Sequence, residues 1–148
     1  MPAPALELEP GEQLLALTPA SFRGAAASTA RATFALGSAR LRNTAFHAWC
    51  DHVEPAGFPA PGPEMLLALT NRRVLVCAKT FWLGRLARVE GALPLDRIAE
   101  IVTVRHGLVM GCAFALTDGH IIEVEAMRAR RLRRFARALA SAKAGSTG

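Results

Sequence analysis

Residues 65–76, MLLALTNRRVLV, consist of two apolar runs that meet at a short polar turn, Asn71-Arg72. Two such runs separated by two residues are typical of an antiparallel β-hairpin. In that hairpin Leu69 faces Val74 and Leu67 faces Val76. The opposite face is apolar too, and is formed by Leu66, Ala68, Leu75 and Cys77. Because a half-solvated hairpin alternates apolar with polar residues, this hairpin must be covered on both sides.

Other short apolar runs precede and follow this hairpin, and they predict a mainly β chain. The runs are separated by residues that favour turns and loops, such as Pro-Gly and Asp-Gly. The expected strands cover residues 12–18, 66–70, 73–79, 85–93, 97–106, 110–116 and 120–126.

The turn Thr117-Asp118-Gly119 decides the register of the last two strands. A three-residue turn with Gly119 in a left-handed conformation sets Phe114 opposite Ile122, and Cys112 opposite Val124. A two-residue turn would instead set Phe114 opposite Glu123. Because a slip of one residue moves every side chain to the other face, burial favours the three-residue turn.

Two segments have helical periodicity. The first, residues 34–53, carries an apolar stripe and is expected to cover the second face of the opening hairpin. The stripe consists of Phe34, Leu41, Ala45, Trp49 and Val53. The second, residues 128–142, is expected to stop near Gly145, and residues 143–148 are expected to fray. Its apolar seam consists of Leu132, Phe135, Leu139 and Ala142.

Four segments in this order resemble the pleckstrin-homology-like superfold, most closely its GRAM-type and bacterial versions. They are MLLALTNRRVLV, GALPLDRIAEI, AFALTDGHIIEVEA and RARRLRRFARALA. The resemblance covers residues 7–18 and 65–142. It implies one domain over residues 1–148, built as a seven-strand antiparallel barrel or sandwich closed by the C-terminal amphipathic helix. Residues 19–64 then form a helix-bearing insert between strands one and two, where that superfold usually has a short connection.

The positive charge of the chain is concentrated near its end. The formal net charge is +6, and residues 128–143 contribute six arginines, one lysine and no acid. The acidic, proline-bearing first residues do not resemble a signal peptide, and no apolar run approaches the roughly 20 residues of a membrane-spanning helix. We therefore expect a cytoplasmic protein whose three cysteines, Cys50, Cys77 and Cys112, are reduced.

Two groups of residues are candidate binding sites. Lys79, Phe81, Trp82 and Arg85 lie between strands three and four, at the barrel end that the resemblance leaves open. Exposed aromatic and basic side chains there suit a lipid headgroup layer or a peptide, unless Trp82 folds back as a cap on the core. The second group is a basic patch of Arg130, Arg133, Arg134 and Arg137, which is either a solvated helix face or a surface for anions.

Catalytic chemistry has little support in the sequence. His47 and Cys50 share a helix face, but His52 points elsewhere, and two ligands do not make a structural zinc site. The same residues lack a third group that would orient a nucleophile. We expect no catalytic residue, no metal and no cofactor.

These observations favour a non-enzymatic binding or adaptor module that engages a protein partner through its insert or a sheet edge. The alternative is peripheral binding of anionic lipid at the inner membrane face, through the open barrel end and the basic surface. Nucleic-acid binding through the arginine-rich helix is the least favoured alternative. The sequence leaves the partner and the oligomeric state open.

Overall fold

The computed structural model describes residues 8–23, 38–59, 64–79, 87–106, 109–126 and 129–146. The strands and helices occur in the order β1 (Leu14–Phe22), α2 (Ser38–Val53), β2 (Glu64–Thr70), β3 (Arg73–Lys79), β4 (Ala87–Pro94), β5 (Ile98–His106), β6 (Val109–Leu116), β7 (Ile121–Ala126) and α3 (Ala129–Ser146). Two short 3-10 turns, η1 (Glu54–Ala56) and η2 (Leu95–Arg97), follow α2 and β4. The predicted helix within the insert is confirmed as α2 from Ser38 onward, and residues 34–37 of that prediction lie outside the described residues.

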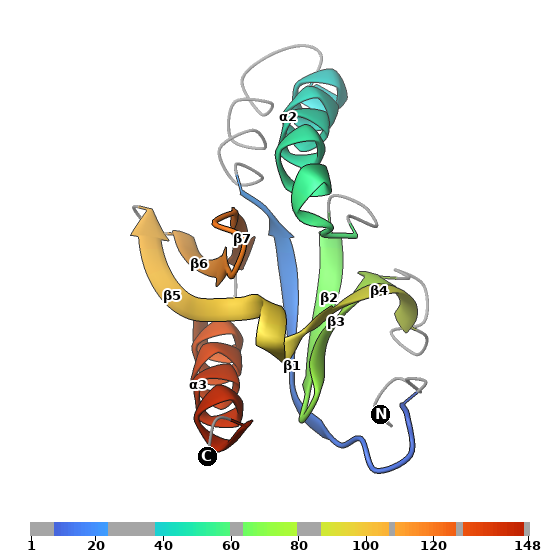
Figure 1. Ribbon diagram of the computed structural model, residues 1–148. Helices are drawn as coiled ribbons and strands as arrows, with labels where there is room; N and C mark the ends of the chain where they lie inside the picture. Colours follow the sequence, from blue (N-terminus) through green and yellow to red (C-terminus); the bar gives the residue numbers. More distant parts are fainter. Residues whose placement is uncertain are drawn as a thin grey trace.

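The seven strands form one antiparallel sheet in the order β4-β3-β2-β1-β7-β6-β5. This confirms a mainly β chain with seven antiparallel strands and a C-terminal helix. The prediction allowed either a barrel or a sandwich. The sheet is not closed into a barrel, so the barrel form of the prediction is wrong. The chain runs from β4 through η2 directly into β5, so these two edge strands follow one another instead of lying side by side (Figure 1).

Both predicted hairpin registers are confirmed. In β2 and β3, Leu67 pairs with Val76 and Leu69 with Val74 across the Asn71-Arg72 turn. In β6 and β7 the partners are those of the three-residue turn, Phe114 with Ile122 and Cys112 with Val124. Gly119 has a φ of 93°, which is the left-handed conformation that this turn requires.

The hairpin of β2 and β3 is buried on both faces, as predicted. Its first face joins the main core of the molecule, in which Leu67, Leu69, Val74 and Val76 are fully buried. The second face forms a smaller cluster around the fully buried Ala68, Leu75 and Cys77. Partly buried hydrophobic residues of β1, β2, β4 and the segment before β1 surround this cluster: Leu8, Leu14, Leu17, Leu66, Val89 and Ala92.

The insert helix α2 lies at the end of the sheet opposite α3 (Figure 1). Trp49 is buried there, and its indole Nε1 donates a hydrogen bond to the backbone oxygen of Glu123 in β7 at 2.9 Å. The ring of Phe46 lies 5.5 Å from that of Phe22 at the end of β1. The prediction that this helix covers the second face of the hairpin is wrong, because its aromatic side chains pack into the main core instead.

The closing helix α3 packs its predicted seam against the main core. Leu132, Phe135 and Leu139 are fully buried. The helix extends past Ala142 and through Gly145 to Ser146, one residue beyond the predicted stop, so residues 143–146 belong to the helix and not to a separate tail. Lys143 Nζ donates a hydrogen bond to the backbone oxygen of Leu95 at 2.9 Å. This contact fixes the last turns to η2, and a glycine in an exposed helical turn costs only about 1 kcal/mol.

Candidate functional site

The first candidate site falls largely outside the described residues. Lys79 is the last residue of β3, and only its backbone is described. Phe81, Trp82 and Arg85 lie in the range 80–86, for which no structure is described. The end of the sheet that the resemblance leaves open is also occupied in part, because α2 packs there over β1 and β7.

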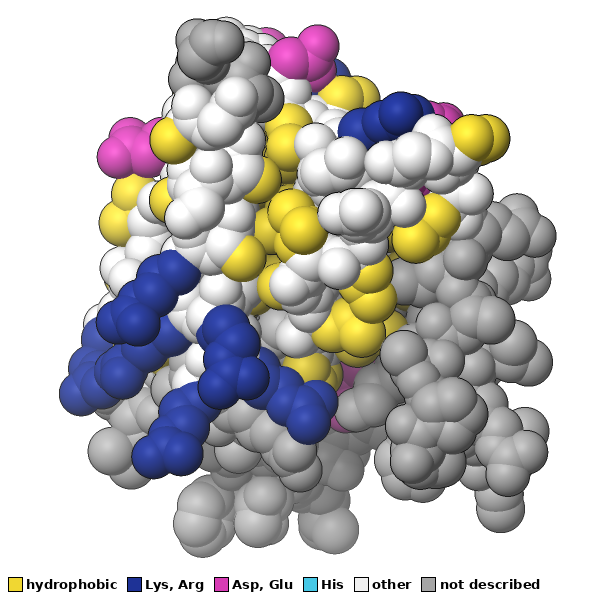
Figure 2. Space-filling view, turned by 90° about the horizontal axis from the view of Figure 1, so that it is seen from below, with side chains coloured by type: hydrophobic (Ala, Val, Ile, Leu, Met, Phe, Trp, Pro, Cys, Tyr) yellow, Lys and Arg dark blue, Asp and Glu magenta, His cyan; other side chains and the backbone are white. Residues whose placement is uncertain are grey.

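The second candidate site forms one exposed face of α3. Arg130, Arg133, Arg134 and Arg137 are all exposed, as is Arg131. Within the described part of the chain, these five side chains form no ion pair with an acid. Figure 2 shows Lys and Arg side chains gathered on one side of the molecule, beside hydrophobic side chains. The apolar seam of α3 faces the core, so its charges point to solvent.

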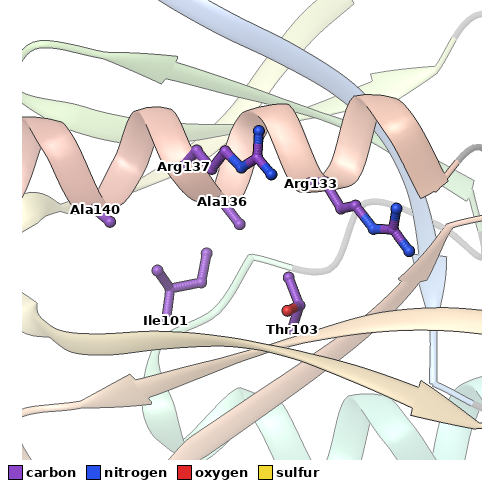
Figure 3. A pocket seen from close by; sticks show the side chains of 6 residues that line it. All are labelled: Ile101, Thr103, Arg133, Ala136, Arg137 and Ala140. Carbon is purple, nitrogen blue, oxygen red and sulfur yellow. The ribbon is translucent and has the colours of Figure 1, made fainter.

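Two of these arginines border an open groove of about 400 Å³ between α3 and β5 (Figure 3). The helix contributes Arg133, Ala136, Arg137 and Ala140, which follow one another on a single face. The strand contributes Ile101 and Thr103. Ala136 and Ala140 are small, and this leaves space between the helix and the strand. The groove thus has an aliphatic floor, positively charged side chains at its border and no acid among its lining residues.

Residues of α3 and β5 face each other across the groove. Figure 3 shows Ile101 of β5 across from Ala136 and Ala140 of α3, and Thr103 nearer Arg133. Four residues of α-helix rise about 6 Å, and two residues of strand rise about 6.6 Å. Each step of two residues along β5 therefore matches about one turn of α3.

One side of β5 is a sheet edge. β5 pairs with β6, and it stands at the end of the strand order. An edge strand presents backbone N–H and C=O groups that a further strand can bind. Val102 lies between the two groove residues and is 44% exposed. Because successive side chains of a strand alternate, Val102 belongs to the face of β5 that points away from the groove.

The cysteine and histidine residues do not form a reactive cluster in the described part of the chain. No group of three His, Cys, Asp or Glu side chains is arranged there to hold a metal ion. Burial raises the pKa of the Cys77 thiol to about 11 and that of Cys112 to about 12. Burial also raises the pKa of Cys50, which is half-buried. All three described thiols are therefore protonated at neutral pH, and the thiol is a poor nucleophile.

Sequence reasoning identified the charged border of the groove but missed its floor. Ile101, Thr103, Ala136 and Ala140 carry no distinctive chemistry. The one sequence signal for the floor of the groove was a pair of small residues among the arginines, one turn apart: Ala136 and Ala140. Nothing in the sequence placed β5 beside that face of α3.

No protein-family model and no curated protein matches this sequence. The fold of the described residues defines the class: a mainly β protein with an open seven-strand antiparallel sheet and a C-terminal helix packed on its core. None of the helices in the described residues has the length and apolar character needed to cross a membrane.

Proposed function

We propose that this protein is a non-enzymatic binding module of the pleckstrin-homology-like superfold, and that it engages a protein partner. The partner contributes an extended segment that adds to the edge of β5 that no described strand covers, and it lies along the groove beside α3. The observation that carries this proposal is the position of the groove directly next to an edge strand.

The proposed mode of binding uses two kinds of contact. Backbone hydrogen bonds to an edge strand supply affinity, and pockets for alternate side chains supply specificity. Here β5 supplies the edge, while Ile101, Ala136 and Ala140 supply an aliphatic surface for the side chains that point toward α3. A floor of small residues suits an inserted side chain, since it leaves volume that the helix does not fill.

The resemblance to the superfold supports the same class of function. Modules of this kind act by binding and not by catalysis, and the described thiols and histidines form no nucleophilic or metal centre. The predicted site at Trp82 and Arg85 is not needed for the proposed mode.

Peripheral binding of anionic lipid is the second candidate, and one observation favours it. Five arginines are exposed on a single helix without an acid of the described chain paired to them. A basic face of this kind attracts a negatively charged membrane, by about 1 kcal/mol for each residue near the surface. The groove is not explained by this alternative, because a flat lipid surface does not require a cavity between a helix and a strand.

The proposal is tested by selecting short random peptides on the full-length protein from a display library. Synthetic copies of the enriched peptides are then measured by fluorescence anisotropy. We expect them to bind the unmodified protein, and to bind an Ala140→Phe variant at least about tenfold more weakly. The phenylalanine fills the groove, and because Ala140 is exposed, the substitution changes stability little.

The matched control is Ser141→Phe, which adds the same ring at the next position, which is also exposed but does not line the groove. Binding that survives Ser141→Phe but not Ala140→Phe supports the groove. The proposal fails if no peptide is enriched, or if both variants bind alike. Co-sedimentation with phosphatidylcholine vesicles, with and without phosphatidylserine, tests the lipid alternative. Binding to the anionic vesicles without any peptide binding would replace the proposed function by that alternative.

A further inference from the structure

The groove also indicates the chemistry of the segment that it takes. We propose that this segment is acidic, with carboxylates at alternate positions that face Arg133 and Arg137. The inference rests on the proposed function of the groove, and it adds the class of partner: an extended stretch of protein in which Glu or Asp alternates with apolar residues.

The spacing of the two arginines carries the argument. Both border the groove on one face of α3 and lie one helical turn apart, at a rise of about 6 Å. On a strand added to β5, every second side chain points toward α3, and these side chains are spaced about 6.6 Å apart. Two acids at positions i and i+2 of the segment therefore meet Arg133 and Arg137 in turn.

The floor of the groove suits the stems of such side chains. A glutamate has two methylene groups before its carboxylate, and these lie over Ile101 and Ala136 while the charged end reaches an arginine at the border. Arg130 and Arg134 extend the positive surface along the same helix. An aspartate or glutamate inside the groove therefore meets a surface without a described competing acid.

The residues between the acids point to the opposite face of the sheet. There they lie beside Val102, which is one of three large hydrophobic side chains that are exposed in the described residues. Side chains that lie opposite each other on neighbouring strands contact one another. An apolar residue at this position covers Val102, so the segment is expected to alternate between acidic and apolar residues.

A synthetic peptide of alternating valine and glutamate tests the inference with the full-length protein. Two control peptides are used: one of alternating valine and glutamine, and one in which the same valines and glutamates are grouped into two blocks. Each exposed ion pair is expected to change affinity about two- to fivefold. Since two pairs form, the alternating acidic peptide should thus bind at least about fourfold more tightly than either control. This difference should shrink as salt is raised, because salt screens exposed charges.

Two pairs of substitutions locate the effect. Arg133→Glu with Arg137→Glu should abolish the preference for the acidic peptide over the glutamine peptide. Arg131→Glu with Arg72→Glu changes the net charge equally at exposed positions that do not line the groove, and should leave the preference in place. Thermal melts establish that each variant is folded. If the double variant at positions 133 and 137 is not folded, the two single variants are measured in its place.

The possible results separate this inference from the proposed function. Suppose that the glutamine peptide binds as tightly as the acidic one and that Ala140→Phe blocks both. Peptide binding in the groove is then supported, and the proposal of an acidic partner is rejected. If the two pairs of arginine substitutions weaken binding alike, the attraction is a diffuse effect of charge and the inference is overturned. If neither these peptides nor selected peptides bind, the proposed function fails, and the inference fails with it.

Discussion

Arg73 binds both carboxylate oxygens of Glu12 in a bidentate ion pair. Arg73 Nε lies 2.9 Å from Oε2 and Nη2 lies 3.0 Å from Oε1, and the hydroxyl of Thr70 donates a further hydrogen bond to Oε2 at 2.7 Å. The side chain of Glu12 is fully buried. This pair joins the turn before β1 to the start of β3. It therefore gives a structural role to Arg73, one of the charged residues at the tip of an otherwise apolar hairpin.

The ion pair predicts a dependence of stability on pH. The hydrogen bonds from Arg73 lower the pKa of Glu12 from an ordinary value of 4.5 to about 2. A group whose pKa is lowered by folding stabilises the protein fully above its unfolded pKa, and this contribution is lost as the pH falls through the folded pKa. Glu12→Gln should reduce the free energy of unfolding at pH 7 by roughly 2 kcal/mol.

Denaturant melts between pH 7 and pH 2 measure this effect. The difference between the natural protein and Glu12→Gln should shrink as the pH falls from about 4.5 toward 2, since Glu12 itself is then protonated. Glu9→Gln is the matched control, because Glu9 forms an exposed pair with Arg72 and should contribute at most about 1 kcal/mol. A constant difference at every pH would contradict the assigned role of Glu12.

Gly119→Ala should destabilise the protein by roughly 1 kcal/mol. A Cβ at this position meets no atom within 4 Å, so the cost comes from the positive φ of 93° alone. Gly145→Ala is the control: its Cβ also meets nothing, but the residue is helical, and alanine should be neutral or stabilising there. Equal effects of the two substitutions in thermal melts would argue against the left-handed turn.

Phe135→Ala should reduce the free energy of unfolding by roughly 3 to 5 kcal/mol, because it leaves a cavity where a fully buried ring packs between α3 and the sheet. The neighbouring exposed residue provides the comparison, and Arg134→Ala should change stability by no more than about 0.5 kcal/mol. Denaturant melts that give a small loss for Phe135→Ala would place this ring outside the core.

Gly91→Ala should be destabilising for a steric reason. A Cβ on Gly91 in β4 would lie 2.5 Å from Cγ and 2.6 Å from Cβ of Pro59, which follows the insert helix. Crowding of this kind typically costs about 1 to 3 kcal/mol. Pro59→Gly removes both atoms, so in a double-mutant cycle the combined variant should lose less stability than the sum of the two single variants. Simple additivity would mean that the two residues do not touch.

Most strands and both hairpin registers were predictable because they depend on local patterns, but β1 continues to Phe22, past the predicted end of that strand at residue 18. The two-residue turn after Thr70 and the three-residue turn before His120 fix which side chains face each other, and burial then selects between registers. The position of α2 was not predictable in this way. Its contacts with Phe22 and Glu123 join residues far apart in the chain, and helical periodicity identifies the apolar face of a helix without identifying what it packs on.

The candidate site was predictable only in part, for the same reason. The seam of Leu132, Phe135 and Leu139 fixes which face of α3 is buried, so the exposure of Arg133 and Arg137 followed from the sequence. The groove requires β5 to lie along that helix, and this depends on how the whole sheet bends. A residue such as Ile101 becomes part of a binding surface through its neighbours and not through its own chemistry.

The central place of β1 has a consequence for synthesis of the protein. Ser21 and Phe22 of β1 pair with Glu125 and Val124 of β7, near the other end of the chain. While the chain is being made, β1 to β4 can assemble first, and β1 then remains an unpaired edge until β7 leaves the ribosome. A nascent chain that stops after β5 is thus expected to pair with other chains along β1, so the risk of aggregation is greatest during translation.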